Sequence, residues 1–126
     1  MKKAILALGL LPLLAACADT KQGKLRQTVF DVDSAYHVLA NPMPDVMAGK
    51  VPGIALTDTQ KDIAKRASQT VFNEIQSLET SIEAGSSITQ TAVSALQTDF
   101  ASFETCWAGL KTGTTPDACA AIGGSK

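Results

Sequence analysis

The sequence predicts an all-α protein, a small three-helix bundle with an antiparallel helix hairpin, behind an apolar N-terminal segment. Three stretches repeat apolar residues every three or four positions, which is the period of an amphipathic helix. Prolines and glycines separate these stretches. Only Gly85-Ser86-Ser87 joins the second stretch to the third, and so short a connection favours antiparallel neighbours.

The N-terminal segment has the organisation of a secretory signal peptide. A lysine pair directly after Met1 forms a basic n-region, and the apolar stretch 4–14 falls within the 7–15 residues of an h-region. This stretch is too short to span a bilayer, which needs about 20 apolar residues. Ala15 and Ala16 are the small side chains that a signal peptidase accepts. The alternatives are an ordinary secretory peptide with an incidental Cys17, or a buried helix whose cysteine is a small hydrophobe.

Leu14-Ala15-Ala16-Cys17 resembles the lipobox of bacterial lipoproteins, a resemblance that covers residues 1–17. It implies cleavage before Cys17, a diacylglycerol on the Cys17 thiol, acylation of the new amino terminus and the lipid bilayer as a partner. An aspartate after the cysteine marks inner-membrane retention in enterobacterial lipoproteins. Ala18 at that position therefore favours the outer membrane over the inner one, with the protein facing the periplasm.

These features divide the chain into a lipoprotein signal peptide over 1–16, a polar tether over 17–24 and a helical domain over 25–126. Removing the signal peptide removes Lys2 and Lys3, which leaves nine basic residues against twelve acidic ones, a formal charge of −3. The mature length is typical of one domain. No basic patch stands out, so nucleic acid is not an expected partner.

The first predicted helix covers about 25–41. Its apolar stripe comprises Leu25, Val29, Val32, Tyr36 and Leu39. Asn41-Pro42-Met43-Pro44 ends this helix, because proline lacks an amide donor and disfavours helix in the residue before it. The segment 42–54 is expected to be a loop whose apolar residues include Met43, Val46, Met47 and Val51. It either closes the core over the helix ends or presents a methionine-bearing contact surface to a partner.

The second predicted helix covers about 58–84 and the third covers about 87–111. Thr57-Asp58-Thr59-Gln60 matches a capping box at the start of the second helix, and Gly85 is a natural stop at its end. Ser86 or Ser87 is the expected cap of the third helix. The two apolar faces comprise Ile63, Ala67, Val71, Ile75, Leu78 and Ile82, followed by Ile88, Ala92, Leu96, Phe100, Phe103, Trp107 and Leu110.

The C-terminal tail is expected to form a short helical turn over 116–122, with proline at its first position after a cap at Thr115. An export signal implies an oxidising compartment, so Cys106 and Cys119 are expected to form a disulfide that clamps this tail over Trp107. Two free buried thiols are the alternative. A metal site is disfavoured, because two sulfurs with no histidine nearby do not fill a tetrahedral shell.

Few residues suggest chemistry. His37 is the only histidine and lies beside the core stripe, so it is expected at the edge of the buried face or in solvent. Glu79 and Glu83 share a helix face that is expected to be solvated. The Phe100, Phe103 and Trp107 stripe could line a ligand cavity or a haem slot, although this spacing is more typical of a core. We therefore expect no catalytic residue, metal ligand or cofactor.

These observations favour a membrane-anchored envelope lipoprotein that acts by contacts with an unknown envelope protein or in a structural role, without catalysis. One alternative is a small-molecule or lipid-binding helical module in the periplasm, with a cavity inside the bundle. Another is an enzyme using His37 or carboxylates. A lipobox followed by a small helical domain is similar, in organisation only, to short lipoproteins of bacteria and their phages, including outer-membrane components of phage lysis systems. No diagnostic motif accompanies this likeness, so it assigns no residue roles.

Overall fold

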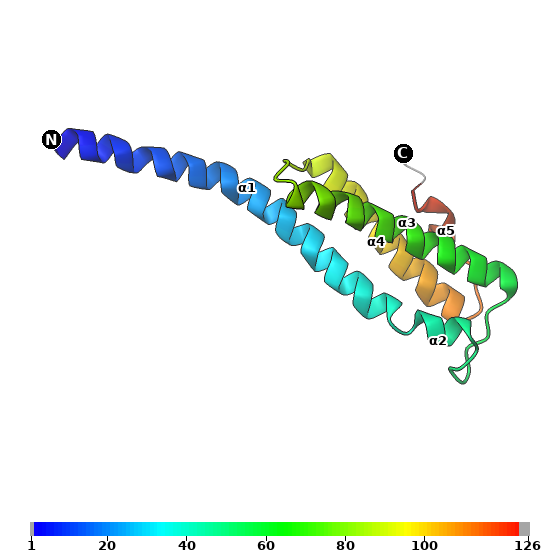
Figure 1. Ribbon diagram of the computed structural model, residues 1–126. Helices are drawn as coiled ribbons and strands as arrows, with labels where there is room; N and C mark the ends of the chain where they lie inside the picture. The colour runs from blue at the N-terminus through cyan, green and yellow to red at the C-terminus, as the bar shows by residue number, and fades with distance from the viewer. Residues whose placement is uncertain (1, 124–126) are drawn as a thin grey trace.

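The structure, a computed structural model, describes the backbone of residues 2–123 and the side chains of residues 21–123. Every regular element in this part of the chain is a helix, which confirms the all-α prediction. The helices are α1 (Lys2–Ala40), α2 (Met43–Met47), α3 (Asp58–Glu83), α4 (Gln90–Lys111) and α5 (Ala118–Ala121). Helices α1, α3 and α4 pack together as the predicted bundle, with α3 and α4 as its hairpin, and α5 packs on α4 and α3 (Figure 1).

The core forms where the apolar stripes of the three long helices meet. Its largest fully buried side chains are Trp107, Phe103, Ile75, Leu96 and Leu110. Helix α1 adds Val29, Val32 and Tyr36 from its predicted stripe. The aromatic residues of α4 are therefore core residues, as their helical spacing indicated.

Helix α1 begins much earlier than the predicted start at residue 25. It runs from Lys2 through the segment 17–24, which we expected to be a tether outside the domain. That segment contains no proline, and its single glycine, Gly23, costs a helix only about 1 kcal/mol. Gln22 already contacts the bundle by hydrogen bonds to Ile88, so the domain begins before Leu25.

The segment 42–54 is not entirely a loop, because it contains the short helix α2. Pro44 lies in the first turn of α2, where a missing amide donor costs nothing. Met43 and Val46 are buried in the core. This burial agrees with a segment that closes the core over the helix ends.

Both ends of α3 follow the sequence pattern. The Thr57 hydroxyl accepts a hydrogen bond from the Gln60 amide, and the Gln60 side chain accepts one from the Thr57 amide, so the capping box is confirmed. At the other end, the amide of Gly85 donates to the carbonyl of Ile82, and the amide of Ser86 donates to that of Ser81. These two bonds form a Schellman motif, which requires the positive φ of +75° at Gly85.

The predicted cap of α4 at Ser86 or Ser87 is wrong. Thr89 is the cap, because its hydroxyl accepts from the amide of Ala92. Ile88 before the cap and Val93 at the fourth helical position are both buried, an arrangement typical of a hydrophobic staple. Burial of Ile88 therefore delays the start of the helix by three residues relative to the predicted start at 87.

The tail also starts its helix later than predicted. Asp117, without a side-chain hydrogen bond, is the residue before α5, so Pro116 precedes the helix and is not its first position. The carbonyl of Pro116 accepts from the amide of Cys119. Pro116 instead packs against α4, as described below.

Candidate functional site

The proposed lipid site lies in the N-terminal part of α1. Cys17 is within this helix, and its side chain lies outside the described residues. None of the helices, over the residues that the structure describes, is both long enough and apolar enough to cross a membrane. Five positions separate Cys17 from Gln22, a rise of about 7.5 Å along an α-helix.

Gln22 joins α1 to the connection between α3 and α4. Its side-chain Nε2 donates to the carbonyl oxygen of Ile88 at 2.9 Å, and its Oε1 accepts from the Ile88 amide at 3.0 Å. Ile88 lies between the two helices, where its backbone groups have no helical partner. One side chain therefore satisfies both backbone groups of a buried residue, which makes the contact costly to lose.

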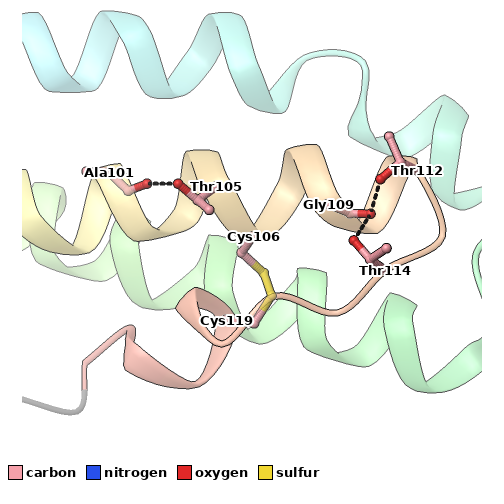
Figure 2. The surroundings of a disulfide bond; sticks show 7 residues. All are labelled: Ala101, Thr105, Cys106, Gly109, Thr112, Thr114 and Cys119. Carbon is pink, nitrogen blue, oxygen red and sulfur yellow. Dashed lines mark hydrogen bonds between the residues drawn. A yellow bond between two sulfur atoms is a disulfide. The ribbon is translucent and has the colours of Figure 1, made fainter.

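Cys106 and Cys119 lie at disulfide distance, as the cysteine count predicted. Their sulfur atoms are 1.99 Å apart and their Cα atoms 4.8 Å apart, so α5 is linked to α4 (Figure 2). Cys106 and its neighbour Trp107 are both buried. No group of three or more histidine, cysteine, aspartate or glutamate residues in the described part of the chain could hold a metal ion.

Gly109 allows the tail to cross α4 closely. A Cβ atom built at Gly109 would overlap the Cγ atom of Pro116 and lie 2.6 Å from its Cδ atom. The Gly109 carbonyl also accepts from the amide and the hydroxyl of both Thr112 and Thr114 (Figure 2). The sequence places this glycine within the last turns of the helix but does not reveal its contact with Pro116.

The tail is also held by a buried carboxylate. Asp99 of α4 is only 2% exposed, and its Oδ1 accepts from the amide of Gly123 at 3.2 Å. Asp99 was not among the predicted site residues, although its position in the sequence carries a signal. Its spacing from Leu96 and Phe103, three before and four after, puts it on the apolar face of the helix.

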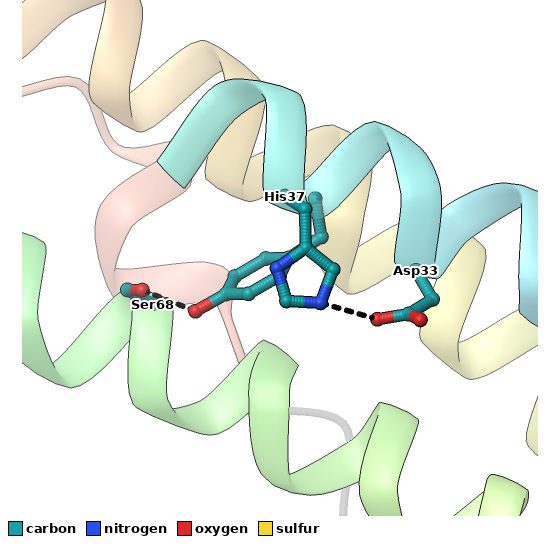
Figure 3. A network of polar contacts seen from close by, with 4 residues as sticks. Asp33, His37 and Ser68 are labelled. Atoms are coloured by element: carbon teal, nitrogen blue, oxygen red, sulfur yellow. Dashed lines mark hydrogen bonds and ion pairs between the residues drawn. The ribbon is translucent and has the colours of Figure 1, made fainter. Parts of the chain in front are cut away.

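His37 lies where the sequence placed it, on the exposed side of α1. Its side chain is 56% exposed, and its Nε2 lies 3.1 Å from Asp33 Oδ1 (Figure 3). The neighbouring Tyr36 is buried and exchanges a hydrogen bond of 2.8 Å with Ser68 on α3. His37 and Asp33 therefore form a polar edge beside the α1–α3 contact.

Glu79 of α3 faces this polar edge. Partial burial, followed by the negative charges of Asp33 and Glu83, raises the pKa of Glu79 above its ordinary value of 4.5, and His37 opposes the rise. Glu79 was expected on an ordinary solvated face, and its proximity to the charged residues of α1 was not predicted. No local pattern shows them, because they belong to another helix.

Glu79→Gln is expected to raise the free energy of unfolding slightly at pH 7. A raised pKa means that the folded state keeps the proton where the unfolded chain has lost it, so ionised Glu79 destabilises the fold above that pKa. The gain should vanish well below pH 4.5, where both states are protonated. Urea unfolding at pH 3.5 and pH 7 measures this, with Glu104→Gln on the exposed face of α4 as control. Equal effects of the two variants at both pH values would contradict the prediction.

A surface groove lies between α3 and α5. It has a volume of about 550 Å³. Its walls come from Ile63, Arg66, Ala67 and Thr70 of α3, and from Thr115, Pro116, Asp117, Cys119, Ala120 and Ile122 of the tail. Arg66 and Asp117 supply one charge of each sign to an otherwise mostly apolar lining. The groove lies outside the three-helix core, whereas the ligand-binding alternative expected a cavity inside the bundle.

Comparison with known proteins adds no further assignment. No protein-family model, curated protein or solved structure matches the chain.

Proposed function

We propose that the protein is a lipoprotein of the bacterial envelope, anchored by acylated Cys17 and facing the periplasm, with the outer membrane favoured over the inner one. The observation that supports this is the lipobox-like Leu14-Ala15-Ala16-Cys17 behind a basic n-region and an apolar h-region. Each buried methylene of an acyl chain contributes about 0.8 kcal/mol, so two or three chains form a stable anchor where a single chain is marginal.

The domain behind the anchor acts by contacts with an envelope protein or in a structural role, without catalysis. Two features support this role. The aromatic stripe of α4 packs in the core, so its residues serve the fold. The only histidine has an exposed side chain that contacts Asp33 on the same helix. The cysteine pair fits an oxidising compartment such as the periplasm.

The groove between α3 and α5 supports a second candidate, a small-molecule or lipid-binding module. Its volume of about 550 Å³ falls in the range of ligand sites, and its mostly apolar walls with one arginine and one aspartate suit a small amphiphile. Native mass spectrometry of the purified protein distinguishes the two candidates. A co-purified ligand favours the binding module, and its absence favours the contact role.

Cys17→Ser is expected to abolish fatty-acid labelling of the protein in an enterobacterial host and to leave the precursor uncleaved. The thiol is the atom that the lipid modifies, and a serine hydroxyl is a far weaker nucleophile. Labelling with a radioactive or clickable fatty acid, followed by electrophoresis, measures both effects.

Ala18→Asp is the matched control for this experiment. It leaves the cysteine in place, so labelling should persist, while the protein should move from the outer to the inner membrane fraction. Labelling that survives Cys17→Ser would refute the anchor. Labelling without relocation in Ala18→Asp would refute only the outer-membrane assignment.

A further inference from the structure

We propose that the protein stands upright on the membrane, with the connection between α3 and α4 facing the lipid headgroups. We call residues 85–89, with Gln22 beside them, the proximal end of the bundle. The distal end comprises residues 41–57 and 112–117. This orientation rests on the lipid anchor at Cys17 proposed above and adds the surface of the domain that meets the lipid.

Gln22 fixes α1 to the proximal end of the bundle. Gln22 uses both polar atoms of its side-chain amide, at 2.9 and 3.0 Å, to pair with the backbone of Ile88. Ile88 itself is buried in the core. The chain that leads from Cys17 therefore meets the bundle at its proximal end, and Figure 1 shows α1 projecting past the α3–α4 connection.

The anchor reaches a much shorter distance than the length of the bundle. The five steps along the chain from Cys17 to Gln22 span about 7.5 Å as a helix and at most about 18 Å when fully extended. Helix α3 has 26 residues and is therefore about 39 Å long. An acylated Cys17 thus holds the proximal end next to the headgroups, while the distal end lies several times farther away.

The proximal end presents a polar surface. Its exposed residues are mostly uncharged hydroxyls and amides flanked by two lysines and one acid: Ser86, Ser87, Thr89 and Gln90, with Lys21, Lys24 and Glu83. With Asp19, which lies between Cys17 and Lys21 in the sequence, the two lysines balance two acids, whereas the mature chain as a whole has twelve acidic residues and nine basic ones. This end therefore lacks the net negative charge that anionic phospholipids would repel, and its lysines can be attracted to them.

A protein lying on its side is the competing arrangement. It would place the outer face of α1 on the lipid, where Phe30 is 43% and Val38 is 75% exposed. Asp31 is also exposed on α1 beside Phe30. Val38 lies sixteen residues beyond Gln22, a rise of about 24 Å along the continuous helix α1. If the protein stands upright, Val38 is therefore held away from the membrane.

Fluorescence quenching by headgroup-labelled lipids tests the orientation. A fluorophore is attached through Ser87→Cys at the proximal end, Val38→Cys on the side or Lys50→Cys at the distal end, all exposed positions. In the acylated, disulfide-bonded protein the introduced thiol is the reactive one. Each full-length mature protein is reconstituted into vesicles of phosphatidylethanolamine and phosphatidylglycerol that contain a nitroxide-headgroup lipid.

We expect quenching at Ser87→Cys to be several-fold stronger than at the other two positions. The fluorescence at those two positions should equal that of the same labelled proteins without vesicles. Equal quenching at Val38→Cys and Ser87→Cys would overturn the proposal in favour of a protein lying on its side. Strongest quenching at Lys50→Cys, or the same quenching at all three positions, would also overturn it.

Flotation of the vesicles separates this proposal from the anchor. A protein that does not float refutes the anchor and the orientation together, whereas one that floats with a different quenching pattern refutes the orientation alone. A second variant carries a Gly-Ser insert of about 20 residues between Asp19 and Thr20, which gives a root-mean-square reach of about 25 Å. It should float, keep its helical circular dichroism and lose the selective quenching at residue 87. If quenching stays selective for residue 87 in this variant, the short anchor is not what sets the orientation of the domain.

Discussion

Replacing Cys106 and Cys119 together with alanine is expected to lower the free energy of unfolding by about 3 kcal/mol. The bond closes a chain segment whose ends are 13 positions apart, and opening it restores conformational freedom to the unfolded chain. The effect should be largest locally at α5. This helix has four residues, none of them buried and no side-chain cap, so it depends on its link to α4.

Urea unfolding of the protein at pH 7, with and without dithiothreitol, measures this change. The reduced wild-type protein should match the double alanine variant, and the reductant should not affect the variant. Hydrogen exchange should show that α5 loses protection while α3 keeps it. A wild-type unfolding midpoint that does not respond to reductant would contradict the prediction.

The long helices were predictable because each one buries a single face over many turns. Tyr36 on α1, Ile75 on α3 and Phe103 on α4 all belong to predicted stripes and all lie in the core. Helix ends were predicted where the signal is local. The capping box at Thr57 needs only a residue three positions away, and it formed as expected.

Contacts between distant residues were not predictable from the sequence. Gln22 and Ile88 are 66 positions apart, and nothing near Gln22 distinguishes it from a tether residue. The cap of α4 depends on the same contact. Ser86, Ser87 and Thr89 are all suitable cap residues, and the burial of Ile88 decides in favour of Thr89.

The proposed anchor follows from a local sequence pattern, whereas the proposed lipid-facing surface follows from a contact between distant residues. The resemblance of Leu14-Ala15-Ala16-Cys17 to a lipobox is entirely local, so the sequence suffices to propose the modification at Cys17. The side of the domain that would meet the membrane follows from the Gln22 hydrogen bonds, which only the structure reveals. The groove between α3 and α5 is likewise formed by segments far apart in the sequence.

Phe103→Ala is expected to lower the free energy of unfolding by about 3–5 kcal/mol, the usual cost of truncating a buried phenylalanine. The Phe103 side chain is fully buried, and its ring centroid lies 5.9 Å from that of Tyr36 and 6.5 Å from that of Phe100. Truncation therefore removes contacts with both α1 and α4. Since a domain is stable by only about 5–15 kcal/mol, this one change removes a large share.

Phe30→Ala is the matched control, because it removes the same ring from a position that is 43% exposed on α1. It should change the free energy of unfolding by less than about 1 kcal/mol, as surface substitutions usually do. Thermal unfolding followed by circular dichroism compares the two variants, and similar losses in both would contradict the packing of α1 on α4. Phe103→Ala should still be labelled with fatty acid, because the signal that directs acylation lies within residues 1–17. A labelled but protease-sensitive Phe103→Ala protein would show that attachment to the membrane does not require a stable bundle.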